Sequence, residues 1–191
     1  FTKIRKLNSL LLPTQAFTRH LFENSSDTTI DGAKFPLLSL ETLLVYLFLH
    51  FYHHNFCGAH RMELIDSLVG GKDVNWKKVR NTIEKFNLQT LVYPGIFFLR
   101  KYYRTPFPKK FIKAIKTPVL PRVVSQVILR ILSPFDSGDR AYEGAKRFVF
   151  LFLLSPSSIF KKIRIILHKD TRAYFFPTIK SLLLSFFTKA S

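Results

Sequence analysis

Large apolar residues occupy almost every position of Leu40–Phe51, so they lie all around the helix rather than along one stripe. This pattern predicts a helix that is buried on every side, and Ser39 in front of it is a favourable N-cap residue. Residues 76–86 differ, because their apolar side chains recur at helical spacing with lysines opposite, which predicts an amphipathic helix. Asp73 or Asn75 is expected to cap this second helix.

The remaining segments complete a mainly helical chain. Asp31 and Gly32 lie between two short β-compatible segments, which predicts a hairpin. Further helices are predicted over residues 60–69, which Gly70 and Gly71 end, and over 88–103, with a kink or restart at Pro94. A short basic helix is predicted behind the two prolines of residues 106–116, and others over 123–132, 139–154, 158–169 and 177–187. The predicted fold class is therefore mainly α, a multi-helix bundle with a small β-hairpin near residues 28–37.

Composition narrows the class of protein. The 191 residues are 47% hydrophobic and 15% aromatic, which excludes a disordered chain. The longest apolar runs, Leu43–Phe51 and Phe148–Leu154, fall well short of the roughly 20 residues that a membrane-spanning helix needs. The single cysteine, Cys57, excludes an internal disulfide framework and a cysteine-based zinc site, and the N-terminus does not resemble a signal peptide. We therefore expect a cytoplasmic protein with, at most, peripheral membrane contact.

Positive charge is concentrated in one part of the chain. The formal net charge is +18, and no Asp or Glu occurs between Glu84 and Asp136. This favours an anionic partner, namely a nucleic acid, an acidic membrane surface or a phosphorylated substrate; the alternative is a set of solvated helix faces. Rings and cations alternate in FFLRKYYRTPFPKKF, whose candidate anion-binding residues are Arg100, Lys101, Arg104, Lys109 and Lys110.

The sequence motifs favour an anionic membrane surface over a nucleic acid as the partner. Basic amphipathic segments near the C-terminus, SIFKKIRIILHK among them, favour an anionic membrane surface. A nucleic acid is the less favoured partner, because the sequence contains no RNP-type motif, zinc finger or recognisable recognition helix.

A histidine pair is the strongest candidate for chemistry outside the basic segment. His50 and His54 are four residues apart and share one helix face, with His60 and Asp66 following closely. A metal site on them is geometrically allowed, but a zincin motif needs a glutamate after the first histidine, where this chain has Phe51. The favoured interpretation is a hydrogen-bonded pair at the end of a core helix, with Asp66 as a partner, and no metal ligands are predicted.

No catalytic residue is predicted. The sequence lacks a G-x-S-x-G nucleophile elbow, a Walker phosphate loop and a Rossmann glycine fingerprint. It also lacks the D-x-D or D-x-E pair that two-metal phosphoryl chemistry requires.

Three segments follow one another within residues 36–116: PLLSLETLLVYLFLHFYHHNF, RMELIDSLVGG and DVNWKKVRNTIEKFNLQTLVYPGIFFLRKYYRTPFPKKFIKAI. In order and spacing they resemble the C-terminal helical half of uncharacterised nucleotidyltransferases of the polymerase-β-like superfamily. The matching positions are Ser39, Glu41, His50, His54, Asp66 and Trp76. The resemblance makes His50, His54 and Asp66 substrate or scaffold residues.

The resemblance implies a catalytic part upstream, where a glycine-serine turn and a D-x-D strand hold Mg²⁺ for attack on the α-phosphate of an NTP. Neither motif occurs in this chain, which begins at Phe1 rather than at a methionine, so we expect a fragment that holds no cofactor itself. Residues 1–37 would be a remnant of, or link to, an upstream mixed α/β nucleotidyltransferase domain. Residues 38–116 would form the family-like helical domain, and residues 117–191 a basic, aromatic-rich helical extension.

Two functions are therefore expected. The first is the helical portion of a nucleotidyltransferase whose partner is its own upstream catalytic domain, with an unknown acceptor and an association with polysaccharide biosynthesis. The alternative is a non-enzymatic basic helical module that binds an anionic membrane surface or nucleic acid.

Overall fold

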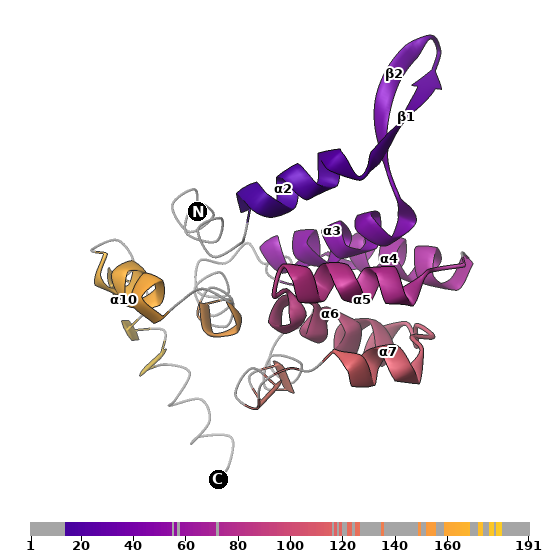
Figure 1. Ribbon diagram of the computed structural model, residues 1–191. Helices are drawn as coiled ribbons and strands as arrows, with labels where there is room; N and C mark the ends of the chain where they lie inside the picture. The colour runs from indigo at the N-terminus through magenta and orange to yellow at the C-terminus, as the bar shows by residue number, and fades with distance from the viewer. Residues whose placement is uncertain are drawn as a thin grey trace.

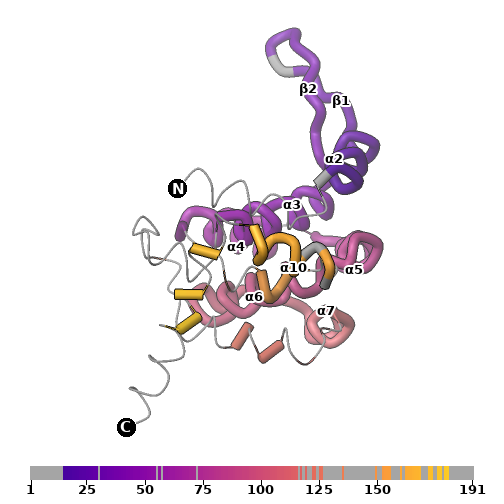
Figure 2. Tube along the Cα trace, turned by 90° about the vertical axis from the view of Figure 1, so that its left-hand side faces the viewer, coloured from indigo at the N-terminus to yellow at the C-terminus, as the bar shows by residue number. Residues whose placement is uncertain are grey.

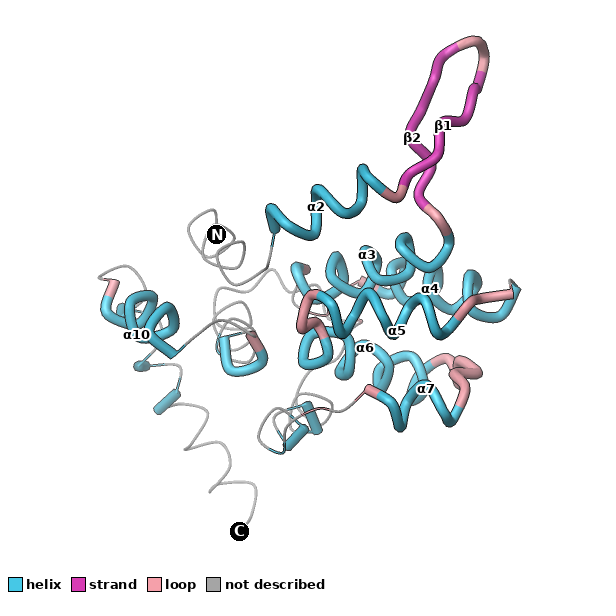
Figure 3. The backbone as a smooth tube through the Cα atoms, viewed as in Figure 1, coloured by secondary structure: helices cyan, strands magenta, loops and turns pink. Residues whose placement is uncertain are grey.

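The computed structural model is mainly helical, with an antiparallel two-stranded hairpin (Figures 1 and 3), which confirms the predicted fold class. It describes residues 14–54, 56, 58–71, 73–115, 117, 119, 122–123, 125–126, 135, 149, 152–155, 159–168, 172–173, 176–177 and 179–180. The elements are α2 (Thr14–Glu23), β1 (Ser25–Ile30), β2 (Ala33–Leu38), α3 (Leu40–His53), α4 (Ala59–Gly71), α5 (Trp76–Lys85), α6 (Gln89–Tyr102), α7 (Lys109–Ala114) and α10 (Ile159–Leu167).

Helix α3 lies at the centre of the bundle and packs against α4, α5 and α6 (Figure 1). Leu44, Val45, Phe51 and Tyr52 of this helix are completely buried. The predicted burial is thus confirmed for most of the circumference, while Tyr46 marks an exposed edge. The core continues into α5 through Val79 and Ile83, as the amphipathic pattern predicts.

The predicted caps begin these helices. Ser39 Oγ accepts a hydrogen bond from the backbone N–H of Thr42 at 3.3 Å at the start of α3. At the start of α5 the cap is Asn75 rather than Asp73, since Asn75 Oδ1 accepts from the N–H of Lys78 at 3.1 Å. The N–H of Asn75 also donates to Glu41 Oε1 at 3.1 Å, which ties the two helix starts together.

Helix α6 is one continuous helix through Pro94, so of the kink or restart predicted there the restart does not occur. The proline removes one backbone donor from the helix, but its neighbours Val92 and Ile96 are buried in the core and hold the helix there. Gly95 allows α6 to approach α3 closely, because a Cβ at this position would lie 2.9 Å from Cδ1 of Phe48. Side-chain packing against the core therefore keeps this segment helical despite the proline.

The hairpin is confirmed and is longer than predicted, over residues 25–38 rather than 28–37. Asp31 and Gly32 both have positive φ values, +48° and +79°, as the type I′ turn of a two-residue hairpin requires. The hairpin extends beyond the helices in both views (Figures 1 and 2). Helix α2 was not predicted; it is held by the buried ring of Phe17, whose centroid lies 5.4 Å from that of Phe86 in an edge-to-face contact.

Other boundaries differ from the prediction in small ways. Helix α4 includes Gly70 and Gly71 instead of ending before them, while α7 begins directly behind Pro108, as predicted. The predicted helix over 158–169 is confirmed as α10, whereas the helices predicted over 123–132, 139–154 and 177–187 lie mostly outside the described residues. No helix within the described ranges has the length and apolar character needed to cross a membrane.

Candidate functional site

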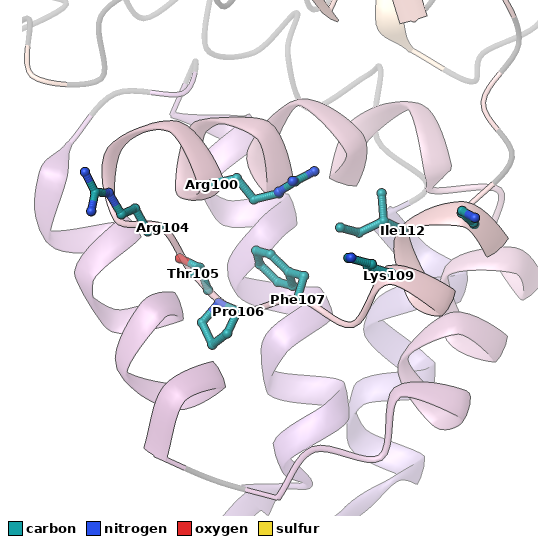
Figure 4. Close-up of a pocket in the computed structure, with 8 residues that line it drawn as sticks. Arg100, Arg104, Thr105, Pro106, Phe107, Lys109 and Ile112 are labelled. Atoms are coloured by element: carbon teal, nitrogen blue, oxygen red, sulfur yellow. The ribbon is translucent and has the colours of Figure 1, made fainter.

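A pocket of about 540 Å³ lies between the end of α6, the loop that follows it and α7 (Figure 4). Four basic side chains line it, here called the pocket cations: Arg100 of α6, Arg104 of the loop, and Lys109 and Lys113 of α7. Thr105, Pro106, Phe107 and Ile112 complete the lining. The lining thus combines positive charge with apolar surface and includes no carboxylate.

The loop between α6 and α7 holds Arg104 in an unusual backbone conformation. Its φ of +57° is in the left-handed region, which costs a non-glycine residue about 1–2 kcal/mol. The residues on either side are held by carboxylates of α4: the Tyr103 hydroxyl donates to Glu63 Oε1 at 3.3 Å, and Thr105 Oγ1 donates to Asp66 Oδ1 at 2.5 Å. These bonds fix the loop, and with it the place of Arg104 at the edge of the pocket.

Aromatic packing holds the other side of the pocket. The ring centroid of Trp76, at the start of α5, lies 5.6 Å from that of Phe107 and 4.5 Å from that of Phe111. Phe107 and Phe111 are buried, so their rings attach the loop and α7 to α5. In Figure 4, Phe107 lies between the α6 side of the pocket and the α7 side.

The pocket cations are not neutralised within the described part of the chain. None of the described carboxylates forms an ion pair with any of the four. Their mutual repulsion is reduced by solvent and salt, and an anion placed among them would remove it. Arginine offers a planar fork of donors and lysine a compact charge, so the arrangement suits phosphoryl, sulfate or carboxylate groups.

The structure brings three of the five predicted anion-binding residues together in the pocket: Arg100, Arg104 and Lys109. Lys101 does not line the pocket; its Nζ lies 5.0 Å from the centroid of the Tyr102 ring. Lys110 is also outside, because it follows Lys109 directly and neighbouring helical residues point in different directions. Lys113 was missed as a site residue, although its spacing of four from Lys109 places both on one face of α7.

The histidine pair and Asp66 make different contacts in the structure. The ring centroids of His50 and His54 are 4.5 Å apart, so these two do lie together at the end of α3. Burial lowers the pKa of His50, and the charge of Arg61 lowers this pKa further. The expected partnership with Asp66 is not found, since its carboxylate accepts instead from Thr105 of the pocket loop. Asp66 thus belongs to the support of the pocket.

Over the described ranges, no three His, Cys, Asp or Glu side chains come together in a group that could hold a metal ion.

No protein-family model matches the chain, and neither a curated protein nor a solved structure matches it. The resemblance to nucleotidyltransferases therefore rests on the sequence motifs of residues 36–116.

Proposed function

We propose that residues 38–116 are the helical portion of a nucleotidyltransferase-family protein, and that the pocket binds phosphoryl groups of its NTP or of an anionic acceptor. The observation that carries the proposal is that four basic residues line one pocket whose lining includes no carboxylate. The family rests on the motifs of residues 36–116, and the role of the pocket rests on its charge and shape.

The chemistry of the lining favours a ligand with several phosphoryl groups. A volume of about 540 Å³ lies within the range of small-molecule sites, roughly 300–1,000 Å³. Arg100 and Arg104 each offer a fork that can donate two hydrogen bonds to one phosphate. The two lysines of α7 add point charges across the pocket. A triphosphate carries enough negative charge to engage both sides at once.

The loop is arranged before a ligand binds, which lowers the entropic cost of binding. Thr105 is bonded to Asp66, and the backbone N–H of Phe107 donates to the carbonyl of Thr105 at 2.9 Å. Asp66 acts in this proposal through Thr105 and is a positioning residue.

A single-stranded nucleic acid fits the pocket less well. Such a ligand needs exposed rings on which bases can stack along a positive groove. Phe107, the aromatic ring that lines the pocket, is buried and already packed on Trp76. The apolar part of the pocket therefore serves the fold, and the cations are what a ligand can reach.

Isothermal titration calorimetry of the full chain tests the pocket with tripolyphosphate, ATP and a sugar monophosphate as probes. We expect saturable binding of one tripolyphosphate or one ATP per chain, weaker binding of the monophosphate, and a loss of affinity as salt is raised. Absence of binding at low salt, or binding of many ligands per chain, would contradict the proposal.

The proposed membership of the nucleotidyltransferase family has a separate test. The reading frame upstream of the Phe1 codon is expected to encode a glycine-serine turn followed by a D-x-D strand. A frame without these motifs would remove the nucleotidyltransferase assignment while leaving the measured affinity of the pocket unchanged.

A further inference from the structure

Helix α10 is attached to the rest of the chain by one of its faces. Ile165 is buried, and Ile166 packs against the core. On the same side, Lys162 Nζ donates to the backbone carbonyl of Leu153 at 3.3 Å and lies 5.7 Å from the centroid of the Phe152 ring. The orientation of the helix is therefore set by its neighbours in the fold.

The opposite face of α10 exposes a row of large apolar side chains. Phe160 is 81% exposed, Ile163 45% and Leu167 63%. Their spacing of three and four residues places them along one line, here called the α10 stripe. Burying such side chains releases about 1.5–3 kcal/mol each, so the exposed row is costly unless another surface covers it.

Positive charge accompanies the stripe. Arg164 is exposed and lies between stripe residues on the helix, and Arg172 and Lys180 follow it as exposed cations. The chain as a whole carries +18. In Figure 1 α10 lies at the edge of the molecule, and Figure 2, which looks onto that side, shows it in front of the bundle.

We propose that the α10 stripe docks on an anionic lipid bilayer. An apolar row with an arginine beside it, in a chain of high positive charge, is the pattern of a helix that lies in a membrane interface, and anionic headgroups attract each nearby cation. A second copy of this chain is disfavoured as the occupant, because two molecules of charge +18 repel each other. This surface uses none of the pocket residues, so it adds to the proposed function and does not depend on it.

Co-sedimentation with vesicles tests the proposal on the full chain. Phosphatidylcholine vesicles with and without phosphatidylserine are compared, for the wild type and for the triple variant Phe160→Ser, Ile163→Ser, Leu167→Ser. We expect the wild type to bind only the anionic vesicles, and the triple variant to bind them at least tenfold more weakly. The replaced side chains are exposed, so the circular dichroism of the variant should match that of the wild type.

The matched control is Phe22→Ser, which removes an exposed phenylalanine from α2 and leaves the charge unchanged. This control should bind vesicles as the wild type does. A Phe160→Trp variant adds a second tryptophan to Trp76, the only natural one, and brominated lipids should quench the added emission.

Three results would overturn the proposal: no binding by the wild type, equal binding by the triple variant, or no quenching at position 160. Sedimentation as a dimer that only the triple variant loses would assign the stripe to a second copy and would equally overturn it.

Discussion

Replacing Arg104 by alanine and by glycine separates the role of its side chain from that of its backbone. Both variants lose the guanidinium group, and they differ in their tolerance of the left-handed backbone that this position adopts, with a φ of +57°. If Arg104 is a pocket cation held in a strained conformation, the two variants should bind tripolyphosphate equally weakly. Their stabilities should nevertheless differ.

The size of that difference in stability follows from the left-handed backbone conformation at position 104. Alanine at a left-handed position costs about 1–2 kcal/mol, whereas glycine pays only its greater freedom in the unfolded chain, roughly 0.5–1 kcal/mol. We therefore expect Arg104→Gly to be about 0.5–1 kcal/mol more stable than Arg104→Ala. For a domain of 150–250 residues this corresponds to a gap in Tm of about 1–4 °C.

Thermal unfolding followed by circular dichroism measures the gap, and calorimetric titration of both variants measures the affinity. Arg104→Ala being as stable as Arg104→Gly would show that the loop does not hold the left-handed conformation. Wild-type affinity in both variants would show that Arg104 makes no contact with the ligand.

Two further predictions concern the core and pH. In urea unfolding, Gly95→Ala should be about 1–3 kcal/mol less stable than the matched helical variant Gly70→Ala. The reason is that the new methyl group meets the buried Phe48 ring at Gly95 and meets nothing at Gly70. Equal stabilities of the two variants would contradict this packing. The pKa values of His50 and His20 are both lowered, first by burial, so the unfolded chain binds more protons than the folded one below about pH 6.5. The urea midpoint should therefore fall from pH 7.5 to pH 5.5 and fall less in His50→Gln, and an unchanged midpoint in the wild type would refute this.

Elements specified by neighbouring residues were predictable from the sequence. The cap Ser39 and the apolar circumference of α3 act within one helix, and Asp31 with Gly32 defines a turn on its own. Helix α2 was missed because its polar composition hides a signal carried mostly by Phe17, whose buried contact is with the distant Phe86.

The candidate site was predictable only in part. The basic segment indicated an anion site. Whether a given cation lines the pocket, however, depends on the helix face that it occupies, and for this reason Lys113 lines the pocket while Lys110 does not. The bond between Asp66 and Thr105 joins residues 39 positions apart. No local pattern predicts such a contact, so Asp66 was expected beside the histidines instead.

The central claim is that the pocket, and not the diffuse positive charge of the chain, binds phosphoryl groups. Lys113→Glu and Lys110→Glu test it most directly, because both change the same charge on α7 and only Lys113 lines the pocket. At one fixed salt concentration, we expect the Kd for tripolyphosphate to rise at least tenfold in Lys113→Glu and less than twofold in Lys110→Glu. Equal losses of affinity in the two variants would contradict the account.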